Sequence, residues 1–389
     1  MIRKILHRLG TISLALMLIV LPGTIDASYA PGTDAAVRIL FINVGKADAI
    51  LISTDTRNYL VDTGEKSSAP KLIGALNAMG VTSLDGVFLT HTHSDHIGGM
   101  DALAQNVKIG MLYSAEFTEL TKKGKNKHEE IASKHGLNLQ KLAAGTIIPL
   151  DNGVEAEVLG PLVLNQEDDN DNSLVLRLKA NGKTVLLTGD MQFAEESTLL
   201  QSGADVSANV LKVGNHGNPD ATSDQFAKAV SPQIAVITTD TTVDADSANP
   251  RVLSALSGAE IYITEDFPIG VLLEIRHDGE IKITAPTVTH ESAKLSITEI
   301  NKEAQTITIQ NDGDCSDISG YMIFSQKGGE LYVFPSGTVL APGQTIRLAG
   351  EGGTGDFIWQ EETKPWNQKK EDTAVLYDRY GNEILRKAK

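Results

Sequence analysis

The chain has 389 residues and a formal net charge of −16. Its length predicts two or three domains, and its single cysteine, Cys315, excludes an internal disulfide, so stability must come from cores, metals and packing. The acidic balance argues against broad attraction to a polyphosphate backbone, which normally needs a basic surface.

The first 30 residues have the three-part layout of a secretory signal. Basic residues between positions 3 and 8 precede the apolar run 12–21, and small residues at 28–30 offer a cleavage site. The apolar run is shorter than the about 20 residues of a membrane span. We therefore expect 1–30 to be a signal peptide and the mature protein to be secreted or held at the cell surface, without a stable membrane span. The alternative is an uncleaved amino-terminal anchor.

From Val37 onward, short strands rich in β-branched residues alternate with amphipathic helices. Strands are predicted at 37–44, 49–53, 58–62, 86–90, 109–113, 173–180, 183–188, 208–213, 233–238, 260–264, 271–276 and 280–283. Helices are predicted at 70–79, 100–105, 117–135, 192–201, 223–229 and 250–256. This order predicts an α/β domain over 31–286, in which two mixed sheets are flanked by helices.

The composition changes after Thr284. Residues 286–293 are typical of a linker, and from Lys294 the helical periodicity gives way to short strands, glycine turns and aromatic residues. Strands are predicted at 295–300, 306–309, 321–324, 331–334, 345–348 and 374–377. This spacing predicts a small all-β domain over 293–389.

The stretch 91–96 (His-Thr-His-Ser-Asp-His) is the richest in chemistry. It directly follows the apolar strand 86–90, whose period of two aims His91 and His93 the same way, while the chain then turns to bring in Asp95 and His96. Imidazole nitrogens and carboxylate oxygens are the ligands that zinc prefers. The cluster predicts a metallohydrolase; the alternative is a surface loop that happens to be rich in histidine.

Two residues farther along the chain stand where they could complete such a site. Asp190 follows the strand 183–188, and His216 follows the strand 208–213. Sites in layered α/β proteins gather at strand ends, so both are candidate ligands. Taken singly, Asp190 reads equally well as a turn aspartate and His216 as a packing histidine.

These motifs appear in the order found in the metallo-β-lactamase superfamily. The resemblance rests on 61–64 (Val-Asp-Thr-Gly), 91–96, 187–190 (Leu-Thr-Gly-Asp) and 215–217 (Asn-His-Gly), and covers about 36–283. Within the superfamily, 171–176 and 210–217 resemble the branch typified by the soluble domain of the DNA-uptake channel protein ComEC. The resemblance implies an αββα sandwich.

The resemblance also implies roles for particular residues. His91 and His93 would hold one divalent ion, Asp95 and His96 a second, and Asp190 would bridge both, with His216 as a further ligand. Zinc is the first choice of metal and manganese the alternative. Substrate contacts are expected from the residues that flank this centre, namely Asn172, Ser173, Lys212, Asn215 and Asn218.

The chain departs from the family pattern at two places. The third motif, 167–172, contains no histidine, so water or an oxygen of this loop would complete coordination there. Asn215 stands where the ComEC-like branch usually has histidine, which would alter turnover or specificity. Away from the motifs, His128 and His135 lie on the polar helix predicted at 117–135, and we expect both to be solvated.

The carboxy-terminal region resembles the lamin-tail domain, an immunoglobulin-like sandwich often appended to secreted bacterial hydrolases. The resemblance rests on segments including 295–300, 318–321, 334–338 and 340–343 and covers about 293–389. It implies binding or tethering rather than catalysis, and so association with a cell surface or wall. Trp359 and Trp366 are expected to be packing residues.

The main functional hypothesis is hydrolysis of a phosphodiester by metal-activated hydroxide, with Asp95 orienting the attacking water and nucleic acid as the first choice of substrate. Two alternatives remain. One is hydrolysis of another ester or amide, such as a lactam or a wall phosphocholine ester. The other is a non-catalytic surface binding protein with a residual metal site.

Overall fold

The computed structural model describes residues 23–24 and 35–389. The predicted signal peptide therefore lies almost wholly outside the described residues; only β1 (Gly23–Thr24), which pairs in parallel with β17 (Pro286–Thr287), falls within its range. In the part of the chain described, no helix combines the length and apolar character that crossing a membrane requires.

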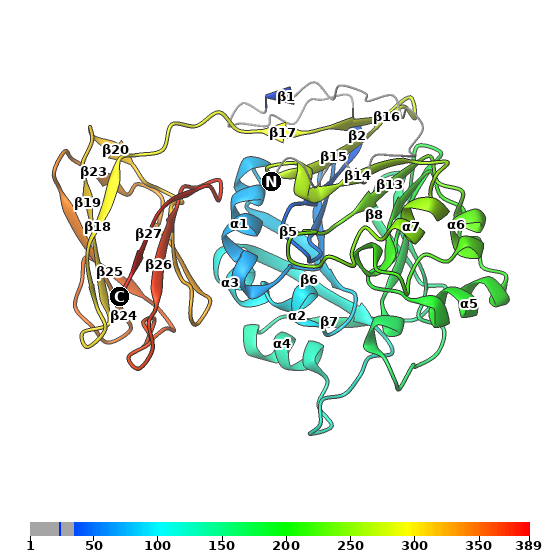
Figure 1. Cartoon of the computed structure of the whole chain (residues 1–389), viewed down its shortest axis with the longest axis horizontal. Helices are drawn as coiled ribbons and strands as arrows, with labels where there is room; N and C mark the ends of the chain where they lie inside the picture. The colour runs from blue at the N-terminus through cyan, green and yellow to red at the C-terminus, as the bar shows by residue number, and fades with distance from the viewer. Residues whose placement is uncertain (1–22, 25–34) are drawn as a thin grey trace.

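Two mixed sheets form the centre of the larger domain (Figure 1). Across the described residues, the first has eight strands in the spatial order β16 (Ile281–Thr284), β15 (Gly270–Arg276), β2 (Ala35–Ile42), β3 (Ile50–Thr54), β4 (Asn58–Val61), β5 (Ser83–Leu89), β6 (Lys108–Ala115) and β7 (Leu139–Leu142). The second, over the same residues, has seven: β14 (Glu260–Ile263), β13 (Ile234–Ile237), β12 (Val210–Lys212), β11 (Lys183–Leu187), β10 (Val175–Ala180), β9 (Val154–Gly160) and β8 (Ile147–Asp151).

Helices cover the outer faces of both sheets (Figure 1). The first sheet is covered by α1 (Ala69–Ala78) and α3 (Met100–Asn106), and the second by α5 (Phe193–Ser202), α6 (Asp224–Val230) and α7 (Pro250–Ala255). Shorter elements lie in the connections: α2 (Ser94–Ile97), α4 (Lys127–His135), η1 (Lys66–Ser68), η2 (Asp169–Asn172), η3 (Gly214–Gly217) and η4 (Thr264–Asp266). The predicted αββα sandwich is confirmed.

The layers explain why the central strands are apolar on both faces. Seven of the eight residues of β2 are buried, because one face meets the helix layer and the other meets the second sheet. Leu40 and Ile42 join the core beneath α1 and α3, whereas Ile39 and Phe41 join the core between the sheets. If a strand that is buried on both faces slipped by one residue, its two sets of apolar side chains would exchange faces and neither would become exposed. The register is therefore set by the strand ends and the turns.

The smaller domain is an all-β sandwich, as predicted. Its four-stranded sheets, counted over the described residues, are β18 (Leu295–Asn301), β19 (Thr306–Asn311), β24 (Thr345–Gly350) and β25 (Phe357–Trp359), and β22 (Glu330–Val333), β21 (Met322–Ser325), β26 (Thr373–Tyr377) and β27 (Glu383–Ala388). The short pair β20 (Ser316–Asp317) and β23 (Val339–Leu340) closes one end. Trp359 and Trp366 are 3% and 1% exposed and lie in its core, which agrees with a packing role.

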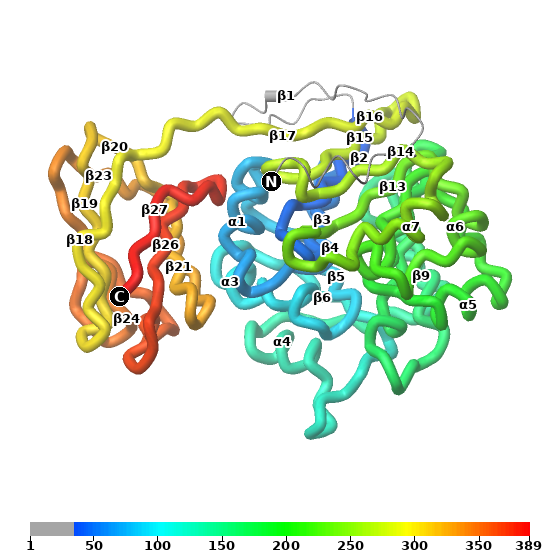
Figure 2. The backbone as a smooth tube through the Cα atoms, viewed as in Figure 1, coloured from blue at the N-terminus to red at the C-terminus, as the bar shows by residue number. Residues whose placement is uncertain are grey.

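This second domain packs against the α1 and α3 layer (Figure 2). Met322, Phe324 and Leu331 belong to the same apolar core as the helices. The contact is close at Gly74, where a Cβ atom would lie 2.3 Å from the Tyr380 backbone. The two domains therefore share an apolar core and are not connected by the linker alone.

The helix predicted over 117–135 is wrong in its first half. Only Lys127–His135 is helical, because Gly124 takes a φ of 72° and the Asn126 side chain caps the helix by accepting from the Glu129 amide. His128 is also not solvated: it is fully buried, with Nε2 3.2 Å from the His91 carbonyl oxygen. His135 is partly buried and pairs with Asp101 at 2.8 Å.

Glu195 on α5 gives the fold a testable pH dependence. Burial raises its pKa well above the ordinary value of 4.5, and the Asp171 and Glu196 carboxyls add to the effect. Both of its carboxylate oxygens are buried without a hydrogen-bond partner. The folded protein thus holds this proton more tightly than the unfolded chain, so this group makes the free energy of unfolding fall as pH rises above 4.5.

We predict that Glu195→Gln raises the free energy of unfolding at pH 8 by about 1–3 kcal/mol, with a smaller gain at pH 5. Urea unfolding at the two pH values measures the difference. Glu303→Gln, at an exposed glutamate, is the control and should change little. A gain for Glu195→Gln that is the same at both pH values would contradict this account.

Candidate metal centre

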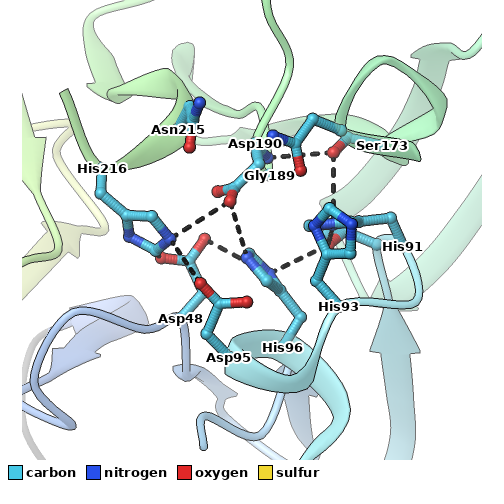
Figure 3. Close-up of polar contacts among 12 residues, drawn as sticks. Asp48, His91, His93, Asp95, His96, Ser173, Gly189, Asp190, Asn215 and His216 are labelled. Atoms are coloured by element: carbon cyan, nitrogen blue, oxygen red, sulfur yellow. Dashed lines mark hydrogen bonds and ion pairs between the residues drawn. The ribbon is translucent and has the colours of Figure 1, made fainter. Parts of the chain in front are cut away.

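The candidate site lies where several strands of both sheets end. Asp62 follows β4, the stretch 91–96 follows β5, Asp190 follows β11 and His216 follows β12. The parallel pairs β4–β5 and β11–β12 bring neighbouring strand ends to the same edge of each sheet. The stacking of the two sheets then brings both edges together, so residues from distant parts of the chain meet (Figure 3).

Four of the six predicted ligands form one compact group: Asp95, His96, Asp190 and His216. Asp190 Oδ2 lies 3.1 Å from His96 Nε2 and 3.2 Å from His216 Nε2, and Asp95 Oδ2 lies 3.4 Å from His216 Nε2 (Figure 3). Donors in a tetrahedron with bonds of about 2.0–2.1 Å are about 3.3–3.4 Å apart. Three of the six donor pairs therefore have about the spacing of a tetrahedral site, and all four donor atoms lie within 4.8 Å of one another.

The orientation of the two imidazoles supports the same reading. His96 Nδ1 is 2.7 Å from Asp62 Oδ2, and His216 Nδ1 is 2.7 Å from the Thr238 carbonyl oxygen. Each outer nitrogen thus has an acceptor for its proton, which leaves Nε2 as the lone-pair atom that faces the carboxylates. Both Nε2 atoms are buried without a hydrogen-bond partner, and so is Asp190 Oδ1. These residues fit a divalent cation.

The electrostatics of the group favour positive charge at its centre. Burial lowers the pKa of His96, but Asp190 and Asp62 outweigh it and hold that pKa well above its ordinary value. Burial likewise raises the pKa of Asp190, but His216 and His96 outweigh it and hold that pKa well below its usual range. The carboxylates that attract a proton to the rings would also attract a metal cation.

His91 and His93 form a separate pair. His91 Nε2 lies 3.1 Å from His93 Nδ1, and burial lowers the His91 pKa well below its ordinary value. Among the described residues, the groups of three or more donors close enough to share an ion include neither ring. Asp169 of the third motif does not fill the gap, because its oxygens accept from Thr92 and from the amide of Glu119. A second ion at this pair stays a prediction.

Lys212, predicted to touch substrate, has a structural role at the centre. It is fully buried, and its Nζ lies 2.5 Å from Asp48 Oδ2 and 2.8 Å from the Gly189 carbonyl oxygen. It therefore balances the charge of Asp48 and holds the turn that carries Asp190. Its ammonium is buried with these partners, and substrate contact by Lys212 stays a prediction.

Asn172 and Ser173 were also predicted to touch substrate, and both are fully buried. The Asn172 amide bonds within its own loop, to the Asn165 carbonyl oxygen and to Asp169. Ser173 Oγ accepts from the Asp190 amide at 3.0 Å and lies 3.4 Å from His91 Nδ1. These side chains position the loop and the ligands, and direct substrate contact by either stays a prediction.

Asn215 and His216 share an unusual backbone. Their φ angles are 41° and 54°, in the left-handed region that asparagine tolerates better than most residues. Asn215 is 5% exposed, donates to Asp220 at 3.0 Å and lies apart from the cluster in Figure 3. Asn218 is partly exposed and donates to Asp244 at 3.3 Å. Substrate contact by Asn215 or Asn218 stays a prediction.

Sequence reasoning missed the acids behind the ligands. Asp62 stood in the quoted 61–64 motif, and its positive φ of 59° at the end of β4 turns the carboxylate toward His96. Asp48 and Lys46 lie in the turn after β2, and no sequence pattern there indicated that they belong to the site. His128 supports the 91–96 backbone through the His91 carbonyl, and only its packing shows this.

The family model for the metallo-beta-lactamase superfamily matches residues 42–239, just over half of the chain. The chain belongs to this superfamily. The model for the lamin tail domain matches residues 289–387, so the second domain is a lamin-tail domain. The fold and the resemblance inferred from sequence are thus confirmed, and the superfamily implies divalent metal use.

Two of the relatives are a competence protein and a ComE operon protein. Competence protein ComA of Neisseria gonorrhoeae is 33% identical over 210 residues, which cover 53% of this chain and 27% of that protein. ComE operon protein 3 of Bacillus subtilis (strain 168) is 27% identical over 225 residues, 53% of this chain and 29% of that protein. The chain thus spans less than a third of their length. A solved diphosphatase of the PhnP family aligns with a TM-score of 0.36 at 14% identity, covering 58% of this chain and 83% of that one.

The difference between the four-donor group and the histidine pair can be measured. We predict that the purified protein holds about one tightly bound divalent ion per chain. His216→Ala should lose most of it, because three donors remain, whereas His93→Ala should keep it. Elemental analysis after dialysis against a weak chelator measures the occupancy. Equal loss in the two variants would contradict a single four-donor site.

A second prediction concerns Asp62, which fixes the His96 ring. Asp62→Asn should weaken metal affinity by about 10–100-fold, since a neutral amide is a weaker acceptor than a carboxylate for the proton on His96 Nδ1 and orients the ring less firmly. Competition with a chromophoric chelator gives the dissociation constant. Asp101→Asn is the matched control, because Asp101 also pairs with a histidine, His135, but outside the centre. An unchanged affinity in Asp62→Asn would show that Asp62 does not position His96.

Proposed function

We propose that the chain is an exported metal-dependent hydrolase that cleaves phosphodiester bonds, with nucleic acid as the first choice of substrate. The observation that carries the catalytic part is the pair of buried, unpartnered Nε2 atoms of His96 and His216, which face the carboxylates of Asp95 and Asp190. The choice of a phosphodiester rests on the resemblance of 171–176 and 210–217 to the soluble domain of a DNA-uptake channel protein. Export rests on the sequence pattern of residues 1–30, and surface association on the lamin-tail domain.

Asp95, His96, Asp190 and His216 would hold a divalent cation, which would supply Lewis acidity and lower the pKa of water toward neutrality. The chain itself provides the positioning. Asp62 and the Thr238 carbonyl hold the outer protons of the two rings, and Ser173 holds the Asp190 backbone. Asp95, whose side chain is 15% exposed, lies at the open side of the group, where it would orient the attacking water.

Asp190→Ala tests the proposal. The variant should lose metal-dependent hydrolysis of bis(p-nitrophenyl) phosphate and of a DNA oligonucleotide, assayed with zinc and with manganese, and should keep its circular dichroism spectrum. Asp205→Ala, at an exposed aspartate that pairs with Arg177, should keep full activity. Full activity in Asp190→Ala would refute the role of Asp190 as a ligand. A wild type that binds metal but cleaves only carboxylic esters or lactams would select another hydrolase, and absence of both metal and turnover would select a binding protein.

A further inference from the structure

Lys46 lies at the edge of the metal centre, in the turn between β2 and β3. Its Nζ is 3.1 Å from Asp95 Oδ2, the same oxygen that lies 3.4 Å from His216 Nε2. The turn is held against α2 because the Asp48 amide donates to the Asp95 carbonyl oxygen at 3.1 Å. The Lys46 side chain is 25% exposed, so its ammonium reaches both solvent and the centre.

Two other lysines near the centre have partners other than the metal ligands. Lys212 is fully buried between Asp48 and the Gly189 carbonyl oxygen, and Lys127 donates to the Thr92 carbonyl oxygen at 2.8 Å. Lys46 contacts a ligand carboxylate directly. Its Nζ lies 3.1 Å from Asp95 Oδ2, on the side of the centre that reaches solvent.

A metal ion in the four-donor group draws on the Asp95 oxygen that Lys46 also uses. The ammonium would then lie near a cation and share with it the carboxylate that it contacts. An anionic group that reaches both relieves this repulsion. If Lys46 were absent, an anion at this position would be repelled by the carboxylates of Asp95, Asp190 and Asp244.

We propose that Lys46 binds the negatively charged non-bridging oxygen of the substrate and so selects anionic phosphodiesters over neutral esters. This inference rests on the proposed function and adds to it the residue that reads the charge of the substrate. Lysine suits this task because its ammonium is a compact point charge with three donors.

Two substrates with the same leaving group test the inference on metal-loaded protein. For Lys46→Gln, kcat/KM on bis(p-nitrophenyl) phosphate, a monoanion, should fall by about 10–100-fold, while kcat/KM on methyl paraoxon, a neutral triester, should change little. Lys46→Arg should restore most of the activity on the diester. Lys179→Gln is the matched control: it removes the same charge from a partly exposed lysine that pairs with Glu157 at 2.7 Å on β10, and should change neither substrate.

Binding of inorganic phosphate, measured by calorimetry on the metal-loaded protein, is the second readout. The affinity should fall by about 10-fold or more in Lys46→Gln and stay unchanged in Lys179→Gln. An equal loss on both esters, or an unchanged phosphate affinity, would overturn the inference and leave Lys46 only as a partner of Asp95. A wild type that cleaves no diester would refute the proposed function, whereas the phosphate titration would still decide the role of Lys46.

Discussion

The carboxylate of Asp190, buried between two imidazole rings, is the constraint on which the site depends. It lies 3.1 and 3.2 Å from His96 and His216 and 3.7 Å from the ammonium of Lys212. A buried carboxylate without such partners would cost several kcal/mol. Asp48 and Asp62 are buried just behind and are paired in turn with Lys212 and His96. Each of these buried charged groups is paired with another one of the group. Moving one ligand would therefore leave another buried charge without its partner.

The arrangement of the sheets allows these charged groups to be held close together in a small volume. Strands β4, β5 and β11 each end in three apolar residues, and each is followed by one or more polar residues of the site. The strands supply rigidity, since their side chains are packed on both faces, and the short turns supply direction. The left-handed backbone at Asn215 and His216 shows the cost of this arrangement, about 1–3 kcal/mol for a non-glycine residue in this region.

The sequence predicted the layers, the strand ends and the four donors, because each of these follows from local pattern: apolar runs, the spacing of 91–96, and polar residues after strands. It did not predict which polar residues are buried. Lys212 and Asn172 look like ordinary surface residues in sequence, and only the packing of Asp48 and Asp169 against them shows that they are internal. His128 escaped for the same reason, since the depth of a histidine on a short polar helix depends on the surface beneath it.

The two halves of the centre are unequal, and this limits the chemistry that they can support. Four donors surround one position, whereas His91 and His93 stand as a pair beside Ser173, a hydroxyl that positions ligands and brings no charge. A second ion at that pair would need further ligand atoms besides the two ring nitrogens. The oxygens of an anionic substrate would supply such ligands. The same argument applies at the other edge of the centre, where Lys46 faces Asp95. Under the proposed function, both sides of the centre leave negative charge to be supplied by the substrate, which would let a strongly acidic protein bind an anion.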